Sequence, residues 1–128
     1  MNAIVTYINL LRAIHHAPPL ILSQKLNWVA GNWSEYMARS GRFDHSFAPY
    51  GENIARIGGT NHTLAAIRAV NMSYAEAGNM GGHFTQLVWK SSRFIGIGVA
   101  NTSRVSYVTF EFDPPGNVAG QYGRNVLL

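Results

Sequence analysis

The 128-residue sequence contains no cysteine. A disulfide framework and thiolate ligation of a metal are therefore both excluded. The absence favours an intracellular setting, because disulfides persist mainly in oxidising compartments. It does not exclude secretion, since many secreted proteins also lack disulfides.

Acidic residues are scarce, with six Asp and Glu against ten Lys and Arg, which gives a net charge of +4. The basic residues are dispersed, and no two are adjacent. A dedicated nucleic-acid surface needs clustered basic residues, so we expect no nucleic-acid partner. The pattern predicts scattered surface charge and leaves open a weak attraction to an anionic membrane surface.

The sequence also lacks the run of roughly 18 apolar residues that a membrane span requires. The segment Met1 to Val5 has no basic region or cleavage signature of a secretory peptide. Asn2 stands where N-myristoylation needs glycine. We expect an intracellular or peripheral-membrane protein if the chain is complete, and an extracellular one if a signal peptide was removed.

The composition, with 47% hydrophobic and 12% charged residues, predicts one globular domain spanning residues 1–128. Four residues spaced four, three and four apart share one face of a predicted first helix: Ile4, Ile8, Leu11 and His15. The pair Pro18-Pro19 ends that helix, because proline donates no backbone hydrogen bond and restrains the residue before it.

A second helix is predicted between Ser23, a good N-cap, and Gly41, a natural C-terminal stop. Trp28 and Trp33 lie on this helix, and we expect them in the core or lining a groove. A third helix is predicted to begin at residue 60 or 61 and to reach residues 74–76. The stretch 41–59 between these two helices is expected to be an irregular, aromatic loop.

Two strands follow a breaker segment at residues 78–82. In the first, Gly96 and Gly98 alternate with larger apolar residues, so one face is nearly bare and suits close packing by a helix or strand. The second runs from Val105 to Phe112, and the tail from Asp113 should be loop-like. Helices followed by strands, without regular β-α-β alternation, predict an α+β fold.

Histidine and carboxylate residues gather in the loop regions. Asp44 adjoins His45, Glu52 follows seven residues after that histidine, and Glu76 precedes His83 by seven. Imidazole with carboxylate suits zinc, and carboxylates can instead orient ligating imidazoles. Each ligand would come from a different element, so simple loop hydrogen bonding remains the alternative, with His83 a histidine at the edge of the core.

Three further histidines and one asparagine have structural interpretations. His15 and His16 close the first helix and are predicted to lie on the surface as partners of its C-terminal dipole. His62 should be exposed at a helix start. Asn53 is expected to tie the loop backbone.

Four ordered segments carry a resemblance to a known family: Asp44-His45-Ser46, Gly51-Glu52-Asn53-Ile54, residues 82–92 and residues 110–118. The last two resemble the signatures of the CAP superfamily (SCP/PR-1-like), with Phe110 where a cysteine often stands. Residues 9–26 are also similar to the start of that family. The cysteine-free pattern is similar to the Golgi-associated plant pathogenesis-related protein 1 type.

This resemblance implies a single-domain, three-layer α-β-α sandwich with a central cleft. It also implies a cleft tetrad made of His45, Glu52, His83 and Glu76. Asp44 is the alternative fourth member, because the segment between Glu76 and His83 is shorter than the family's usual connection.

The resemblance further implies a binding protein, not a dedicated enzyme. His45 and His83 would hold a divalent metal such as zinc, and lipids, sterols or a protein partner, including a second copy in a homodimer, would be bound. The alternative is a zinc-dependent hydrolase or protease, with Glu52 as general base and His83 as a catalytic residue.

Overall fold

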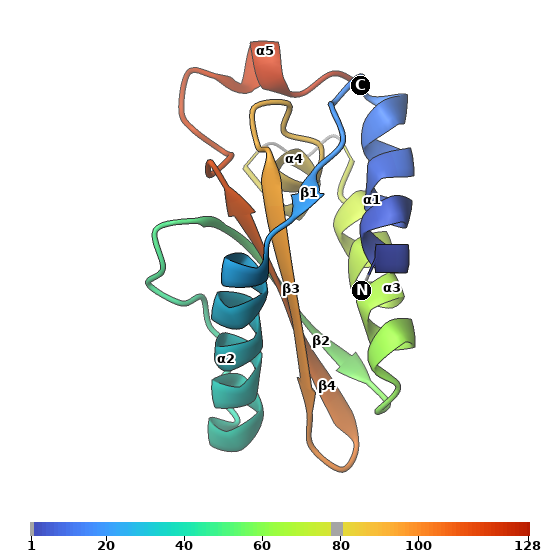
Figure 1. Ribbon diagram of the computed structural model, residues 1–128, viewed down its shortest axis with the longest axis vertical. Coiled ribbons are helices and arrows are strands. Elements are labelled where there is room, and N and C mark those ends of the chain that lie inside the picture. The colour runs from blue at the N-terminus through green and yellow to red at the C-terminus, as the bar shows by residue number, and fades with distance from the viewer. Residues whose placement is uncertain (1, 78–80) are drawn as a thin grey trace.

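The computed structural model describes residues 2–77 and 81–128, and it has a sheet between helices. In chain order the elements are α1 (Asn2–Ile14), β1 (Ile21–Leu22), α2 (Gln24–Ser40), β2 (Gly51–Gly58), α3 (His62–Tyr74), α4 (His83–Leu87), β3 (Phe94–Asn101), β4 (Val105–Asp113) and α5 (Tyr122–Asn125). In Figure 1, α1 and α3 lie on one side of the sheet and α2 lies on the other. The predicted three-layer α-β-α arrangement is confirmed.

The sheet has the strand order β1-β3-β4-β2, in which β1 is parallel to β3 and the other pairs are antiparallel. Side chains alternate between the two faces, as they must in extended strands. One face carries the main core, which α1 and α3 cover and which includes Ile95, Ile97, Val108, Phe110 and Phe112. The opposite face, covered by α2, carries the two glycines of β3.

Helix α2 lies directly on the bare glycine face of β3. An added Cβ at Gly96 would fall 2.0 Å from the carbonyl carbon of Leu26, and one at Gly98 would fall 2.3 Å from that of Ala30. The Ser34 hydroxyl donates to the Gly98 carbonyl at 3.1 Å and lies 2.8 Å from the Thr109 hydroxyl. The predicted close packing against this strand is therefore present.

The predicted ends of α2 are also correct. The Ser23 side chain accepts a hydrogen bond from the backbone N–H of Leu26 at 3.2 Å. Gly41 closes the helix with φ at +73°, a left-handed conformation that glycine adopts without steric cost. Trp33 is half-buried, packs against a small core cluster and lines a surface groove, and Trp28 is exposed beside that groove.

The prediction of an irregular loop over residues 41–59 is wrong for its second half. Strand β2 occupies Gly51–Gly58 and pairs with β4 along its whole length. Polar residues interrupt the alternation of apolar and polar residues that would indicate a strand in the sequence. The extended conformation of β2 therefore depends on its pairing with β4. The predicted breaker segment includes residues 78–80, which lie outside the described residues.

His15, predicted to lie on the surface, is buried, and so is Arg12, one of the dispersed basic residues. Arg12 is 0% exposed, and its guanidinium donates to the backbone carbonyls of Pro18, Leu87, Trp89 and Ser92. His15 is also buried, with Nδ1 at 2.6 Å from the Leu127 carbonyl and Nε2 at 2.7 Å from the Tyr74 hydroxyl. The surface interpretation fails because both side chains point inward and find polar partners there.

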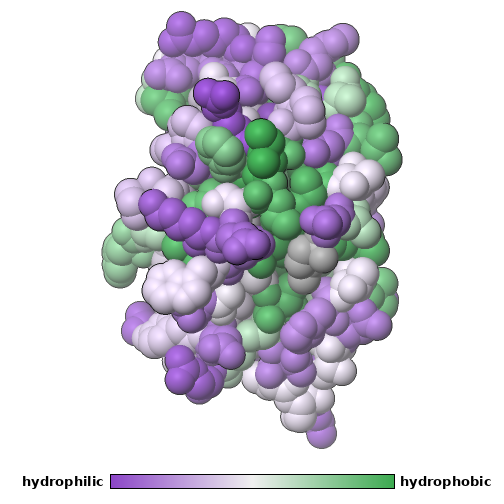
Figure 2. Space-filling model, viewed as in Figure 1, coloured by the Kyte–Doolittle hydropathy of each residue, from purple (hydrophilic) through white to green (hydrophobic). Residues whose placement is uncertain are grey.

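Among residues 2–77 and 81–128, no helix is long and apolar enough to cross a membrane. Figure 2 shows apolar side chains gathered in a band down the middle of one face, over β1 and β3, with polar side chains on both flanks. Exposed apolar residues are common on folded proteins, so this band alone assigns no partner.

Candidate functional site

His45 and His83 line the same small cavity, which has a volume of about 140 Å³. His45 comes from the loop that precedes β2, and His83 is the first residue of α4. The cavity lining consists of His45, Glu52, Asn53, Gly81, Gly82, His83 and Asn117. The fold thus brings together two histidines that are 38 residues apart in the sequence.

The carboxylate of Glu52 is hydrogen-bonded to the imidazole of His45. Its Oε1 lies 2.8 Å from His45 Nδ1 and accepts the Ser46 backbone N–H at 2.9 Å, while its Oε2 accepts the Ser46 hydroxyl. The Glu52 side chain is 7% exposed and that of His45 is 60% exposed. Because the carboxylate requires a donor at Nδ1, neutral His45 presents an unprotonated Nε2.

Glu76 binds His83 in a similar way. One carboxylate oxygen accepts the His83 backbone N–H at 2.9 Å, and the other lies 2.8 Å from His83 Nδ1. Asp44 instead forms an exposed ion pair with Arg42, with 3.6 Å between the closest atoms. Each cleft histidine therefore has one glutamate at its Nδ1, and Glu76, not Asp44, has this position beside His83.

Glu111 is a site residue that sequence reasoning missed. It stands directly opposite Glu52 in the β2–β4 register, it is 0% exposed, and neither of its carboxyl oxygens has a hydrogen-bond partner among the described residues. An acidic residue inside a strand, between Phe110 and Phe112, was the available signal. The register that pairs it with Glu52 could not be read from the sequence.

The two carboxyl groups have opposite pKa shifts. Burial raises the pKa of Glu111 to about 10, and the nearby Glu52 carboxylate adds to the effect. Burial also acts to raise the pKa of Glu52, but the adjacent Glu111 carboxyl group and the hydrogen bonds from Ser46 and His45 outweigh it and lower this pKa below its ordinary value. The two shifts favour the neutral form of Glu111 and the ionised form of Glu52.

Residues of the second signature segment hold the His83 turn in place. Asn117 donates to the Gly82 carbonyl at 3.1 Å and accepts the Thr85 hydroxyl at 2.5 Å. Asn53 donates to the His83 carbonyl at 3.0 Å, so it ties backbone as predicted, although in another element. These bonds link β2, α4 and the tail around the cavity.

The imidazoles of His45 and His83 are the groups in this cavity that could ligate a metal. Within the described ranges, no group of three or more His, Asp or Glu side chains has the arrangement of a metal site. The two imidazoles share a cavity, and each has a carboxylate at Nδ1, as ligating histidines commonly do.

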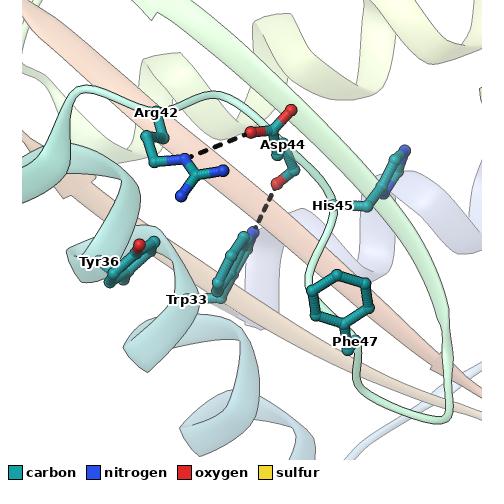
Figure 3. Close-up of a pocket in the computed structure, with 6 residues that line it drawn as sticks. All are labelled: Trp33, Tyr36, Arg42, Asp44, His45 and Phe47. Carbon is teal, nitrogen blue, oxygen red and sulfur yellow. Dashed lines mark hydrogen bonds and ion pairs between the residues drawn. The ribbon is translucent and has the colours of Figure 1, made fainter.

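A larger groove of about 590 Å³ adjoins His45, and we call it the α2 groove (Figure 3). It is lined by Trp33, Tyr36, Arg42, Asp44, His45 and Phe47. Trp33 and Tyr36 project from α2 and stack with ring centroids 5.0 Å apart, and the Trp33 indole donates to the Asp44 carbonyl at 2.9 Å. Phe47 is fully exposed on the facing loop.

The family model described as CAP, the cysteine-rich secretory protein family, matches residues 5–112. A probable pathogenesis-related protein of Candida albicans is 34% identical over 127 residues, covering 93% of this chain and 38% of the relative. Pathogenesis-related protein 1 of Arabidopsis thaliana is 32% identical over 114 residues, covering 80% of this chain and 69% of the relative.

Solved structures show the same fold at lower identity. BmVAL-1 superposes with a TM-score of 0.77 at 19% identity, covering 91% of this chain and 77% of that one. NaASP2, solved with Zn²⁺, superposes with a TM-score of 0.68 at 22% identity, covering 80% and 63% of the two chains. The chain spans only 38% and 40% of the lengths of two fungal relatives.

Proposed function

Since the chain belongs to the CAP family, we propose that it is a binding protein whose His45/His83 cleft holds a divalent metal, preferably zinc, and whose α2 groove holds a lipid or sterol. The observation that carries the metal proposal is the shared cavity, in which each of the two imidazoles has a glutamate at Nδ1. NaASP2, which has the same fold, was solved with Zn²⁺, and this supports the choice of metal.

Removal of one imidazole should abolish most zinc binding. We expect His83→Ala to weaken the zinc Kd by more than the roughly 10- to 100-fold that loss of an outer partner costs. His62→Ala is the matched control, because His62 is exposed at the start of α3 and hydrogen-bonded to Asn101. Calorimetric titration of purified protein with zinc at about pH 7.5 measures both variants. Equal affinities in both variants would remove His83 from the proposal.

Zinc affinity should fall as the pH is lowered. A protonated imidazole has no lone pair for a metal, so acid competes with zinc at His45 and His83. We expect the apparent zinc affinity to be lower at about pH 5.5 than at about pH 7.5, because protons compete with the metal for the imidazole lone pairs. The same titration repeated at several pH values tests this, and a flat profile would indicate ligands other than histidine.

The α2 groove has the shape and lining expected of a site for an apolar ligand. Its walls are aromatic, its volume is about 590 Å³, and a second hollow of about 350 Å³ extends along α2 beside Trp28 and Trp33. Ligand pockets typically combine apolar and aromatic walls with a few polar groups. Here the polar groups are Arg42, Asp44 and His45, which suit the hydroxyl or headgroup end of a sterol or lipid.

Phe47 is the best place to test the groove. We expect Phe47→Ser to weaken binding of a fluorescent sterol about tenfold, because burial of a phenyl ring contributes roughly 1.5–3 kcal/mol. The ring is fully exposed, so the substitution should leave the fold intact. Leu10→Ser removes an exposed apolar side chain from α1, on the other side of the sheet. Equal weakening by both substitutions would indicate nonspecific adsorption.

Two other partners remain proposals. Weak attraction to an anionic membrane surface would follow from the net charge of +4. A homodimer could form through the outer edge of β2, which no described strand pairs with. Light scattering over a range of concentrations tests the dimer, and vesicles with and without anionic lipid test the membrane contact.

The zinc-dependent hydrolase alternative needs Glu52 as general base. Both oxygens of this carboxylate already accept hydrogen bonds from His45 and Ser46, and only 7% of its side chain is exposed. A general base must reach the proton that it abstracts, so this geometry favours binding over hydrolysis. Zinc-dependent turnover of esters or peptides that His83→Ala abolishes would reverse this preference.

A further inference from the structure

A hollow of about 560 Å³ is lined by the segment that leads into β1 and the turn that leads into β3, and we call it the β1 hollow. Its lining consists of Pro18, Pro19 and Ile21 from the first segment and residues 90–93 from the second. Among the described residues, none lines both this hollow and either the His45/His83 cavity or the α2 groove. The volume is typical of pockets for small ligands, and the proposed function makes no use of it.

Hydrogen bonds tie the two sides of the β1 hollow together. The Ile21 N–H donates to the Arg93 carbonyl at 2.9 Å, where β1 pairs with the start of β3 (Figure 1). The buried Arg12 guanidinium donates to the Pro18 carbonyl at 2.9 Å and to the Ser92 carbonyl at 3.2 Å. Both sides are thus held in place before a ligand arrives, which reduces the entropy cost of binding.

Positive charge gathers at the β1 hollow. Lys90 and Arg93 line it, and Arg12 lies between its two sides, bonded only to backbone carbonyls. Within residues 2–77 and 81–128, none of these three side chains forms an ion pair. Asp113 stands opposite Phe94 at the start of β3, but it does not line the hollow. The charge of the hollow therefore favours an anionic ligand.

The backbone of the turn has no donor left for that anion. All four N–H groups of residues 90–93 donate to acceptors inside the protein. The two serine hydroxyls of the turn also donate internally, at 2.6 and 2.8 Å. The remaining donors of the described lining are the side chains of Lys90 and Arg93. Phosphate sites commonly use a nest of backbone N–H groups, whereas a carboxylate, with two oxygens, is satisfied by two side-chain donors.

We propose that the β1 hollow binds a small organic carboxylate, with its carboxylate group on Lys90 and Arg93 and its apolar body against Pro18, Pro19 and Ile21. The planar guanidinium of Arg93 matches the planar carboxylate. The three apolar side chains are exposed in the free protein, so a ligand that covers them removes apolar surface from water. The site is separate from the cleft and the α2 groove, so failure of either proposal there leaves this one standing.

Titration of the whole chain with 2-naphthoate, followed by ¹H–¹⁵N NMR, tests the proposal. We expect saturable shifts of the N–H signals of Ile21 and residues 90–93, with a Kd of about 1 mM or tighter for a ligand of this size. The uncharged 2-naphthalenemethanol should bind about tenfold more weakly or worse, because it lacks the carboxylate. The phosphate monoester 2-naphthyl phosphate should bind no more tightly than 2-naphthoate.

Four results of this titration would overturn the proposal. They are the lack of saturation below about 10 mM, equal binding of the alcohol, tighter binding of the phosphate, and shifts of the Trp33 indole signal without shifts in residues 90–93. The last result would mean that the probe enters the α2 groove, which Trp33 lines.

Two substitutions locate the carboxylate. Arg93→Gln and Lys90→Gln should each weaken 2-naphthoate binding about tenfold, because each removes one charged donor. Arg104→Gln is the matched control, since it removes the same charge from an exposed position between β3 and β4, outside the hollow. Its Kd should stay within about twofold of the wild-type value. Equal weakening by Arg93→Gln and Arg104→Gln would show that only net charge matters and would remove the site.

Discussion

Replacing Gly98 with alanine is expected to lower the free energy of unfolding by about 3 kcal/mol or more. The added methyl would lie 2.3 Å from the Ala30 carbonyl carbon and 2.4 Å from the Gly31 nitrogen. These atoms belong to helix backbone, which cannot rotate away as a side chain would. Relief requires α2 to move off β3, and this movement would also break the Ser34 hydrogen bond to the Gly98 carbonyl.

Gly31→Ala is the matched control for this substitution. Gly31 lies in α2 at the same contact, yet a Cβ there would have no atom within 4 Å. Alanine has a higher helix propensity than glycine, so the free energy of unfolding of this variant should be about 0.5–1 kcal/mol higher than that of wild-type protein. Urea denaturation of both variants gives the two values. If both variants lost similar amounts of unfolding free energy, the close contact between α2 and β3 at Gly98 would not be the cause of the destabilisation.

Arg12→Met is expected to destabilise the fold by about 4 kcal/mol or more, since each buried carbonyl left without a donor costs roughly 1–3 kcal/mol. The guanidinium donates to the carbonyls of Leu87 and Trp89 at 3.0 and 2.9 Å, and also to those of Pro18 and Ser92. Burial lowers the pKa of Arg12 to about 10, so the group is charged at neutral pH. Methionine fills similar volume but supplies no donor.

Arg68→Met makes the same change on the exposed surface of α3 and should cost less than about 0.5 kcal/mol. Arg12→Lys keeps the charge but has fewer donors and no planar guanidinium group. Its free energy of unfolding should therefore lie between those of wild-type protein and Arg12→Met. Guanidinium denaturation distinguishes the three variants. Equal stability of Arg12→Met and Arg68→Met would mean that solvent replaces the lost donors without cost.

The elements that were predictable from the sequence are those fixed by local chemistry. Ser23 and Gly41 mark the ends of α2 because capping involves residues only a few positions apart. The alternation of glycine in β3 was readable for a similar reason, since the period of a strand places Gly96 and Gly98 on one face.

The features that were missed depend on contacts between distant residues. Strand β2 exists because β4 pairs with it, and the importance of Glu111 comes from the register that sets it opposite Glu52. His15 lies on the face that the helix pattern placed inward, but its partners, Tyr74 and the Leu127 carbonyl, are 59 and 112 residues away. Sequence spacing gives the face of a residue, not the group that it meets.

His45 lines both the small cavity and the α2 groove. One side chain therefore borders both proposed binding sites, and we expect a ligand in either one to be sensitive to the position of this ring. By thermodynamic linkage, if a metal in the cavity changes the affinity of the groove by some factor, an occupant of the groove changes the affinity for the metal by the same factor. The two sites then behave as one coupled equilibrium, with the imidazole of His45 as the shared variable.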